Sequence, residues 1–497
     1  MNYEETLIYI HNTPKFARTL GNDLLKKLLK KLGNPQKDLK FIHIAGTNGK
    51  GSAAVMLSQI LINSGLKVGL YTSPYIERFN ERIRINGEEI PDDILADIAT
   101  RIRETLEKYD TPVSEFALDT AIAFEYFKSQ KCDIVVLETG LGGRLDATNV
   151  IEKPLVSVIM SIGLDHTQYL GETIEEITAE KCGIIKKGGK VVIYPDLTDA
   201  AISVVEDFCK RNKAELIKAD MPKILAGKSF KYGETKYRLS LDGDFQKYNA
   251  ATVLCAAETL KRLGYKISDN AITDGLLTAF NPARMEKLPC GLLIDGAHNP
   301  PAVKALCNSL IKKKKPIRLV IAMMEDKDID SCISAFAEIN PMVIATQIDM
   351  PRCLSAIALA EKFKEHNIDV TVEENSITAA KMGAEFTENG EVCCVCGSLY
   401  LAGEIRRNLK NYKKYYVYIL RCEDNSLYTG ITTDVQRRFN EHKNDMKKGA
   451  KYTASHTPIS IEAVFEAENR SEASKLEAHI KTLTKAQKEE LIKKSKM

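Results

Sequence analysis

Short apolar runs alternate with helical patterns along the first half of the chain. Strands are predicted at 41–45, 67–71, 133–137 and 155–160, and a helical pattern covers 53–64. The later runs are apolar on both faces, which is typical of parallel strands that helices cover on both sides. Strands that alternate with helices predict an α/β fold. We therefore expect a doubly wound α/β domain over residues 1–288.

The same alternation resumes near residue 291 and changes after residue 412. Apolar runs at 317–323, 342–346 and 392–396, with a helical stretch at 355–366, predict a smaller α/β domain over 289–412. Beyond it, the runs 415–422 and 426–429 flank Asp424-Asn425, residues that favour tight turns. We expect a β-hairpin followed by basic helices, in a small α+β domain over 413–497.

Composition fits three globular domains. The chain has 497 residues, of which 44% are hydrophobic and 28% charged, and this length exceeds what one core usually supports. It begins without the apolar segment of a signal peptide, and no run approaches about 18 apolar residues. We expect a cytoplasmic monomer without a membrane partner. Net charge is only +3, but residues 413–497 hold 17 Lys and Arg against 12 Asp and Glu.

Twelve cysteines are scattered along the chain. Many lie in apolar runs, and a cytosol would keep them reduced. Cys393 and Cys396 have a CxxC spacing, but a zinc site needs a second ligand pair and none follows. We expect free, buried cysteines and interpret 392–396 as a buried strand.

The segment 43–52 carries the first chemical signal. It follows a predicted strand and opens a helix, where backbone N–H groups and the helix dipole hold phosphates. Lys50 would pair with the transferred phosphate. The segment is a shorter variant of GxxxxGK[ST], because Ile44 occupies the place of the first Gly. The predicted nucleotide-binding residues are Thr47, Asn48, Gly49, Lys50, Gly51 and Ser52.

With 46–52, the motifs at 72–74, 138–149 and 295–300 resemble those of folylpolyglutamate and dihydrofolate synthases, in the wider Mur ligase family. The resemblance covers about residues 10–408 and includes 162–166, 180–184 and 326–328. It implies ATP-dependent ligation of L-glutamate to (tetrahydro)folate through an acyl phosphate, and also to dihydropteroate. The segment 326–328 would lie near the glutamate-accepting cleft.

The resemblance also assigns roles to single residues. The Mg²⁺ ligands would be Ser73, Glu138 and His166. Lys181 matches a lysine that is carbamylated in many relatives, and Lys50, Lys181 and His298 would be catalytic. The remaining nucleotide contacts would be Asn249, Arg284 and Asp295. Since they flank residue 288, we expect two domains to close over ATP and exclude water.

Three departures from the family pattern stand out. The segment 20–24 lacks the Arg that many relatives carry near the pteroate. Ala117 replaces a usual Glu, and Phe245 replaces a frequent His. A cell-wall ligase is the alternative within the wider family, but about forty residues before Gly46 are too few for its UDP-binding domain.

Residues 415–492 resemble small GIY-YIG nucleases. The resemblance assigns Tyr418, Tyr428, Arg438 and His442 as catalytic residues and Glu477 as a metal ligand. Either the tyrosine pair or His442 would activate water, and Arg438 would stabilise the phosphorane. The basic clusters 437–438 and 447–448 would bind DNA or RNA phosphates. The alternative is a monofunctional folylpolyglutamate synthase with an inactive nucleic-acid-binding module.

Overall fold

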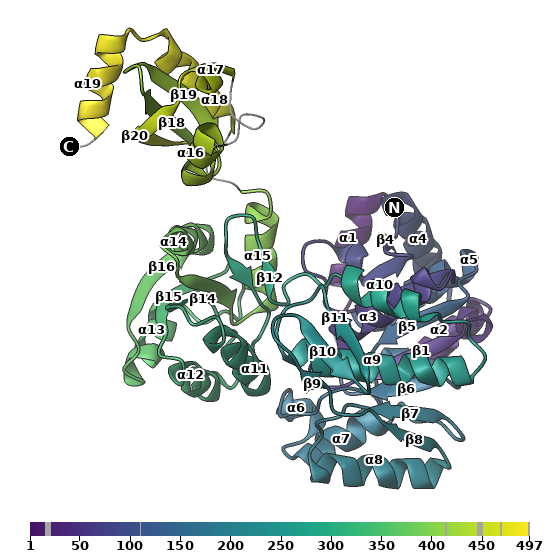
Figure 1. Ribbon diagram of the computed structural model, residues 1–497. Coiled ribbons are helices and arrows are strands. Elements are labelled where there is room, and N and C mark those ends of the chain that lie inside the picture. The colour runs from purple at the N-terminus through teal and green to yellow at the C-terminus, as the bar shows by residue number, and fades with distance from the viewer. Residues whose placement is uncertain (15–20, 110, 413–414, 445–450, 468–469, 496–497) are drawn as a thin grey trace. The chain divides into compact units, whose positions relative to one another are not determined.

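The computed structural model describes residues 1–14, 21–109, 111–412, 415–444, 451–467 and 470–495. The chain divides into two compact units, which are shown in Figure 1. The first unit comprises residues 1–287 and 292–407, and the second comprises 288–291 and 408–497. The first unit contains a larger and a smaller lobe, each built on its own sheet.

The larger lobe has an eight-stranded sheet in the order β4-β3-β2-β5-β1-β6-β7-β8. Its six parallel strands are β2 (Val68–Tyr71), β5 (Ile134–Glu138), β1 (Phe41–Ala45), β6 (Val156–Ile159), β7 (Lys190–Ile193) and β8 (Glu215–Lys218). The short strands β3 (Ile83–Ile85) and β4 (Glu88–Glu89) add an antiparallel edge. The 3₁₀ turns are η1 (Pro35–Asp38), η2 (Phe79–Arg82) and η3 (Ala147–Val150).

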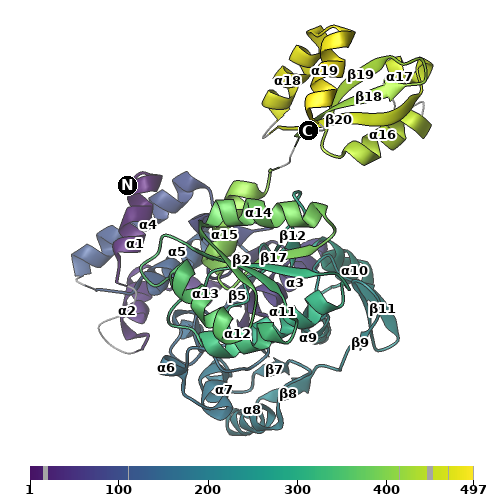
Figure 2. The same cartoon turned by 90° about the vertical axis from the view of Figure 1, so that its left-hand side faces the viewer.

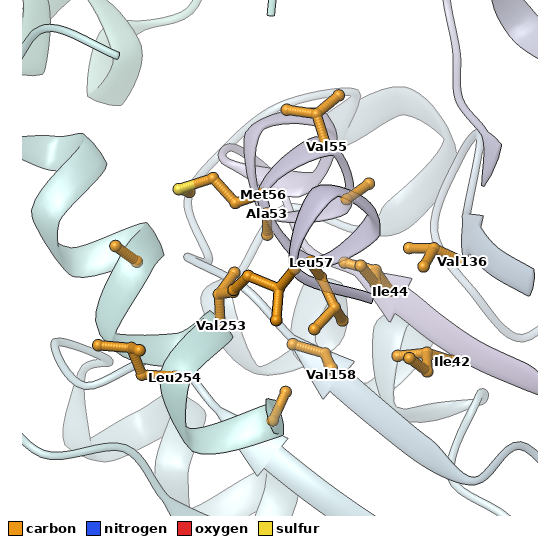
Figure 3. Packing of buried hydrophobic residues seen from close by; sticks show 14 of the residues in the cluster. Ile42, Ile44, Ala53, Val55, Met56, Leu57, Val136, Val158, Val253 and Leu254 are labelled. Carbon is orange, nitrogen blue, oxygen red and sulfur yellow. The ribbon is translucent and has the colours of Figure 1, made fainter. Parts of the chain in front are cut away.

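Helices cover both faces of this sheet. One face is covered by α3 (Lys50–Asn63), α9 (Phe245–Arg262) and α10 (Asp269–Thr278). The other face, near β2, β5 and β1, is covered by α1 (Tyr3–Asn12), α2 (Asp23–Lys31), α4 (Asp92–Tyr109) and α5 (Glu115–Ser129). Alternate strand residues point to opposite faces, so Ile42 and Ile44 pack with Leu57 of α3, as Figure 3 shows, while Phe41 packs against Phe124. This confirms the predicted doubly wound fold.

Smaller elements complete the larger lobe. Beside β7 lie α7 (Ile174–Cys182) and α8 (Asp199–Asn212), and α6 (Thr167–Leu170) precedes them. A three-stranded sheet of β9 (Lys223–Ile224), β10 (Ser229–Tyr232) and β11 (Thr235–Arg238) contributes Phe230 to the core under α9. The predicted helix at 53–64 begins three residues earlier, at Lys50, because Gly49 takes the N-cap position.

The smaller lobe has a six-stranded sheet. Its order is β12 (Glu286–Lys287), β13 (Leu293–Ile294), β17 (Val392–Cys396), β14 (Ile317–Ile321), β15 (Met342–Gln347) and β16 (Val370–Asn375), and all but β12 are parallel. Its helices are α11 (Pro300–Ile311), α12 (Ile329–Ala337), α13 (Ala356–Glu365), α14 (Ser376–Glu388) and α15 (Leu399–Leu409), seen in Figure 2. Side chains of α11, α12 and α13 share one core with the sheet.

The prediction of free, buried cysteines is confirmed for ten of the twelve, and two are free but only partly buried. All twelve cysteines are free thiols, and β17 is buried along its whole length as predicted. Cys290 and Cys353 are only partly buried, because they lie in loops rather than in core strands. Within the described residues no three His, Cys, Asp or Glu side chains are grouped to hold a metal ion.

The second unit is a small α+β domain. Its antiparallel sheet has the order β19 (Leu427–Thr432), β18 (Tyr415–Cys422) and β20 (Pro458–Ala467). Its helices are α16 (Val435–Asn444), α17 (Lys451–Ser455), α18 (Arg470–Thr482) and α19 (Lys485–Ser495). The predicted hairpin is present: Asn425 has φ 62°, and the Asp424 carboxylate accepts from the Ser426 N–H and hydroxyl.

The second strand of the hairpin extends to Thr432, beyond the predicted end at 429, because the ladder with β18 continues to Thr432 opposite Tyr416. The exact domain boundaries at 288 and 412 stay a prediction, and residues 413–414 lie outside the described residues. No helix among the described residues is long and apolar enough to cross a membrane.

One buried ion pair in the larger lobe makes stability depend on pH. The Asp119 carboxylate lies 3.7 Å from the Arg82 guanidinium, and within the described residues neither of its oxygens accepts a hydrogen bond. Burial raises the pKa of Asp119 to about 7, although Arg82 opposes the shift. The folded state thus holds a proton that the unfolded state releases above about pH 4.

We predict that replacing Asp119 by Asn removes this contribution. Between pH 5.5 and 8.5 the parent chain should lose about 2 kcal/mol of unfolding free energy relative to Asp119→Asn, since ionisation of a buried carboxyl is unfavourable. Urea titrations across this range measure the difference. Asp274→Asn, at an exposed aspartate of α10, is the control. Parallel pH profiles for the parent and Asp119→Asn would contradict the prediction.

Candidate functional site

A cavity of about 470 Å³ lies in the first unit and is lined by both lobes. The lining residues follow the carboxyl ends of β1, β2, β5 and β6 in the larger lobe and of β13, β14 and β17 in the smaller one, where ligands bind to parallel sheets. The cavity brings together every site residue predicted in the ligase-like part, namely Thr47, Asn48, Gly49, Lys50, Gly51, Ser52, Ser73, Glu138, His166, Lys181, Asn249, Arg284, Asp295 and His298.

The loop between β1 and α3 depends on glycines. Gly49 has φ 84°, and a Cβ there would lie 2.4 Å from the Asn249 Oδ1 atom. A Cβ on Gly46 would lie 2.6 Å from the Cβ atom of Met160. The first N–H groups of α3 have no acceptors within the helix, so they are available to an anion in the cavity.

Two lysines, the partly buried Lys50 and the buried Lys181, share one acceptor in this loop. The Lys50 Nζ atom donates to the carbonyl oxygens of Gly46 and Thr47, at 2.9 and 3.3 Å, and the Lys181 Nζ atom donates to Gly46 at 3.1 Å. Burial and the nearby Lys50 charge lower the pKa of Lys181 to about 7. Burial also lowers the pKa of Lys50, although Glu138 and Asp165 oppose the shift. A large share of Lys181 is therefore a neutral amine at neutral pH.

Glu138 is a buried carboxylate that the larger lobe contributes to the cavity. Its carboxylate is 4% exposed and accepts from the Ser73 backbone N–H at 3.1 Å. Burial raises its pKa, with Lys50 opposing, and within the described residues it forms no ion pair closer than 4.0 Å. A buried carboxylate without a close ion pair suits a bound cation. Glu138, one of the three residues predicted to hold Mg²⁺, thus suits a cation chemically.

His166 is held in an unusual backbone conformation. It has φ 52° and precedes α6, and its backbone N–H donates to the Asp165 carboxylate at 2.9 Å. Left-handed non-glycine residues cluster at functional sites, where the surrounding structure maintains them. Burial lowers the pKa of the imidazole, so it is available as a neutral ligand.

The Ser52 hydroxyl is oriented by two amides. Gln246 and Asn281 donate to its oxygen at 3.1 and 3.2 Å, and Gln246 also accepts from Asn249 at 3.0 Å. Because both acceptor positions of the hydroxyl are engaged, its proton is left to donate to another group. Ser52 is thereby suited to donate to a phosphate rather than to bind a metal.

From the smaller lobe's side, Arg284, Asp295 and His298 enter the same cavity. The Asp295 carboxylate accepts from the backbone N–H groups of Met285 and Ala297, at 2.9 and 2.8 Å. Burial raises its pKa, which Arg284 opposes. His298 shares a hydrogen bond of 2.7 Å with the Gly296 carbonyl, and burial lowers its pKa to about 4.

Sequence reasoning missed the residues that join the lobes. Asn299 donates to the Asp165 carboxylate at 2.8 Å and exchanges amide hydrogen bonds with Asn48 of the nucleotide loop. Lys327 forms a buried ion pair with Asp165 at 3.0 Å. Burial raises the pKa of Asp165, but His166, Lys327 and His298 together hold it well below its usual range. Asp165 and Asn299 lie inside motifs that the sequence already showed. Their role in joining the lobes becomes visible only from their contacts across the junction.

The departures from the family pattern lie around this cavity. Phe245 lines it, and Ala117 is buried in α5. The Asn22 amide donates to the Asp146 carbonyl at 2.7 Å, so the part of 20–24 that the structure describes contacts the Gly-rich 138–149 segment. Leu20 lies outside the described residues.

In the second unit, four of the five predicted residues have described contacts within one cluster. The Tyr418 hydroxyl bonds the His442 Nε2 atom at 2.8 Å, and the Tyr428 ring lies 6.3 and 5.2 Å from the rings of Tyr418 and His442. Arg438 hydrogen-bonds Tyr418 and pairs with Glu441 at 2.8 Å. Burial raises the pKa of Tyr418 and lowers the pKa of His442 to about 4, so both are neutral near pH 7.

Glu477, the fifth residue, lies close enough to act electrostatically on Tyr418, whose pKa its charge raises. Its carboxylate also pairs with Lys481 at 2.8 Å on α18. Sequence reasoning missed Thr453, which bonds the second imidazole nitrogen of His442 at 2.7 Å and thereby fixes the orientation of the ring. The basic cluster 447–448 lies outside the described residues.

Gly430 makes the approach of the two tyrosines possible. A Cβ on this residue would lie 2.5 Å from the Tyr418 hydroxyl oxygen and 3.2 Å from the Tyr428 ring. Glycine is thus required at the third position of the 428–430 triplet for a steric reason. The triplet could be recognised from sequence, but the contact with Tyr418 depends on the pairing of β18 with β19.

Comparisons with known proteins agree with this geometry. The family described as "Mur ligase middle domain" matches residues 44–257, "Dihydrofolate synthetase, C-terminal domain" matches 279–409, and "GIY-YIG catalytic domain" matches 414–490.

Individual relatives match over nearly their whole length. The chain is 36% identical to folylpolyglutamate synthase of Lacticaseibacillus casei and 35% identical to dihydrofolate synthase/folylpolyglutamate synthase of Bacillus subtilis, in each case over 82% of this chain and 99% of the relative. The solved structure of E. coli FolC in complex with DHPP and ADP superposes with a TM-score of 0.73 at 28% identity, over 82% of this chain and 97% of that one. The predicted resemblances are confirmed: the chain belongs to the folylpolyglutamate synthase/dihydrofolate synthase family of Mur ligases and carries a GIY-YIG domain over residues 414–490.

Proposed function

We propose that the first unit ligates L-glutamate to (tetrahydro)folate, and also to dihydropteroate, with conversion of ATP to ADP and phosphate. The observation that carries the proposal is the single cavity that collects the nucleotide loop, the acidic residue Glu138 and cations from both lobes. A carboxylate is a poor acyl donor, so ATP supplies the phosphoryl group that makes it an acyl phosphate. The glutamate amine then attacks the acyl carbon, phosphate leaves, and the amide bond forms.

The residues of the cavity match the charges that this reaction develops. Lys50 and the N-terminus of α3 stabilise the transferred phosphoryl group, and Arg284 approaches the phosphates from the smaller lobe. Asn249 and Asp295 contact the adenosine part of the nucleotide. The ion pair of Asp165 with Lys327 holds the lobes together, which limits hydrolysis of the acyl phosphate by water.

Ser73, Glu138 and His166 would hold Mg²⁺, which neutralises charge on the phosphates when it is bound. Lys181 is proposed to be carbamylated. Its neutral amine can attack CO₂, and the resulting anion removes the repulsion between two ammonium groups. The carbamate would then act with Glu138 on the same cation.

We propose a second function, phosphodiester cleavage, for the GIY-YIG domain. The observation that favours it is the Tyr418–His442 hydrogen bond, flanked by Arg438 and Glu477. A neutral His442 can accept a proton from water directly or through Tyr418. Glu477 would hold a divalent cation and Arg438 would stabilise the phosphorane. The alternative is an inactive module that binds nucleic acid. A cytoplasmic monomer remains our expectation for the chain as a whole.

Of the predictions about activity, the first concerns the ligase reaction. Purified chain should release ADP from ATP in a manner that depends on both glutamate and a reduced folate or dihydropteroate. Lys50→Ala should lower this rate by at least about a thousandfold, because the cation facing the transferred phosphate is lost. Lys40→Ala, at an exposed lysine just before β1, should retain full activity. ADP release that neither acceptor stimulates would overturn the folate assignment.

The second prediction tests the nucleotide loop with two glycines that flank α3, Gly49 before it and Gly65 after it. Gly49 and Gly65 have φ values of 84° and 83°, but only at Gly49 would a Cβ meet another residue, Asn249. Each Ala substitution should cost about 1 kcal/mol of stability through backbone strain. Only Gly49→Ala should also weaken ADP binding, by about tenfold or more, because Asn249 is displaced. Calorimetric titration measures it, and equal affinities in both variants would contradict the prediction.

The third prediction concerns the nuclease. In the presence of Mg²⁺ or Mn²⁺, the chain should nick supercoiled DNA or cleave labelled RNA. Glu477→Ala should lower this rate at least about a hundredfold by removing the cation ligand. Glu472→Ala, an exposed glutamate earlier in α18, is the matched control. Nucleic-acid binding without cleavage by the unaltered chain would instead support the inactive module.

A further inference from the structure

The predicted nuclease site continues into an aromatic stack that its proposed chemistry does not use. The Tyr452 ring lies 4.3 Å from the His456 ring at an interplanar angle of 6°, and 5.8 Å from the Tyr428 ring at 18°. Tyr428 in turn packs edge-on against His442 at 5.2 Å. Three nearly parallel rings therefore lead outward from the cluster of Tyr418, Tyr428 and His442.

The outer part of the stack is accessible and well anchored. Tyr452 is 41% exposed, and the imidazole of His456 is about one-third exposed. The next residue after Tyr452, Thr453, is buried and bonds His442, so the backbone of α17 is tied to the predicted catalytic residue. The His456 Nδ1 atom bonds the Tyr452 carbonyl at 3.0 Å. Rigid, flat and partly exposed rings lose little conformational entropy when a flat ligand stacks on them.

We propose that the His456 ring, backed by the stacked Tyr452 ring, forms a platform on whose outer face a nucleobase stacks, next to the cleaved phosphate of a single-stranded nucleic acid. The inference rests on the second proposed function, because Tyr428 belongs to both the stack and the predicted cleavage site. Aromatic platforms bind bases with little regard to sequence, since every base has a π face.

The distribution of charge supports a base at the stack and phosphates beside it. Asp424 lies 3.5 Å from the His456 Nε2 atom, and its carboxylate repels a phosphate at that end of the stack. Cations instead lie on α16, the helix that carries His442: Arg437 and Arg438 share Glu441, and Lys443 lies over the Phe439 ring at 5.9 Å. The excess of Lys and Arg over residues 413–497 favours a polyanionic ligand.

The test is binding of single-stranded oligonucleotides by the full chain in EDTA, which prevents metal-dependent cleavage. Twelve-nucleotide DNA and RNA strands of mixed sequence, labelled with fluorescein, report affinity by anisotropy, and a strand that contains 2-aminopurine reports stacking by quenching. Tyr452→Ala should weaken binding about 5- to 100-fold and abolish the quenching, while Tyr452→Phe should stay within about twofold of the parent. Ile459→Ala, at an exposed apolar residue of β20 outside the stack, should have no effect.

Each outcome bears on a distinct claim. Binding by the parent chain that is unchanged in Tyr452→Ala overturns the platform and leaves nucleic-acid binding intact. A Phe variant as weak as the Ala variant also overturns it, because the hydroxyl rather than the ring would then be responsible. Failure of the parent chain to bind either strand overturns the platform, whereas the second proposed function is decided separately by the nicking and cleavage assays. Unchanged thermal unfolding of the Ala variant shows that a loss of binding is local.

Discussion

The ligase site depends on two lysine side chains, the partly buried Lys50 and the buried Lys181, that donate to one carbonyl, that of Gly46. Such an arrangement is unfavourable while both groups are charged, and the pKa of Lys181 is accordingly lowered to about 7. Anions relieve the repulsion, whether as phosphates in the cavity or as a carbamate on Lys181. The close approach of Gly46 to Met160, which excludes any side chain, fixes the carbonyl where both lysines reach it. The cavity is thus electrostatically prepared for an anionic nucleotide.

At the junction of the lobes, the negative charge of Asp165 is likewise balanced by neighbouring groups. Asp165 is nearly buried, and three groups of the smaller lobe, His298, Asn299 and Lys327, surround its carboxylate. Since Asn299 also bonds Asn48, the smaller lobe contacts the nucleotide loop directly. Occupation of the nucleotide site and apposition of the lobes are therefore physically coupled. Closure of the lobes would exclude water from the cavity, as the proposed acyl phosphate requires.

The second unit holds Tyr418 and His442 in their neutral forms. Tyr418 and His442 are both uncharged near pH 7 and share a short hydrogen bond, and Thr453 restrains the imidazole from its other side. Its core, built from residues such as Val417, Ile419 and Ile480, belongs to this unit alone. The two proposed activities therefore rest on separate hydrophobic cores and separate site chemistry.

Much of this molecule follows from sequence because local rules apply. Apolar runs such as 41–45 and 392–396 can only be buried strands, and a loop that joins a strand to a helix through Gly49 and Lys50 can only present N–H groups and an ammonium to an anion. Family resemblance also predicted Glu138, His166 and the tyrosines of the second unit as site residues, and the structure places them in one cavity and one cluster. What the tertiary structure alone decided are the pairings between distant residues: Lys181 with the Gly46 carbonyl, Asp165 with Lys327, Asn48 with Asn299, and Tyr452 with His456 and Tyr428. Such pairings set pKa values and close cavities, and they depend on packing of elements that no local pattern encodes.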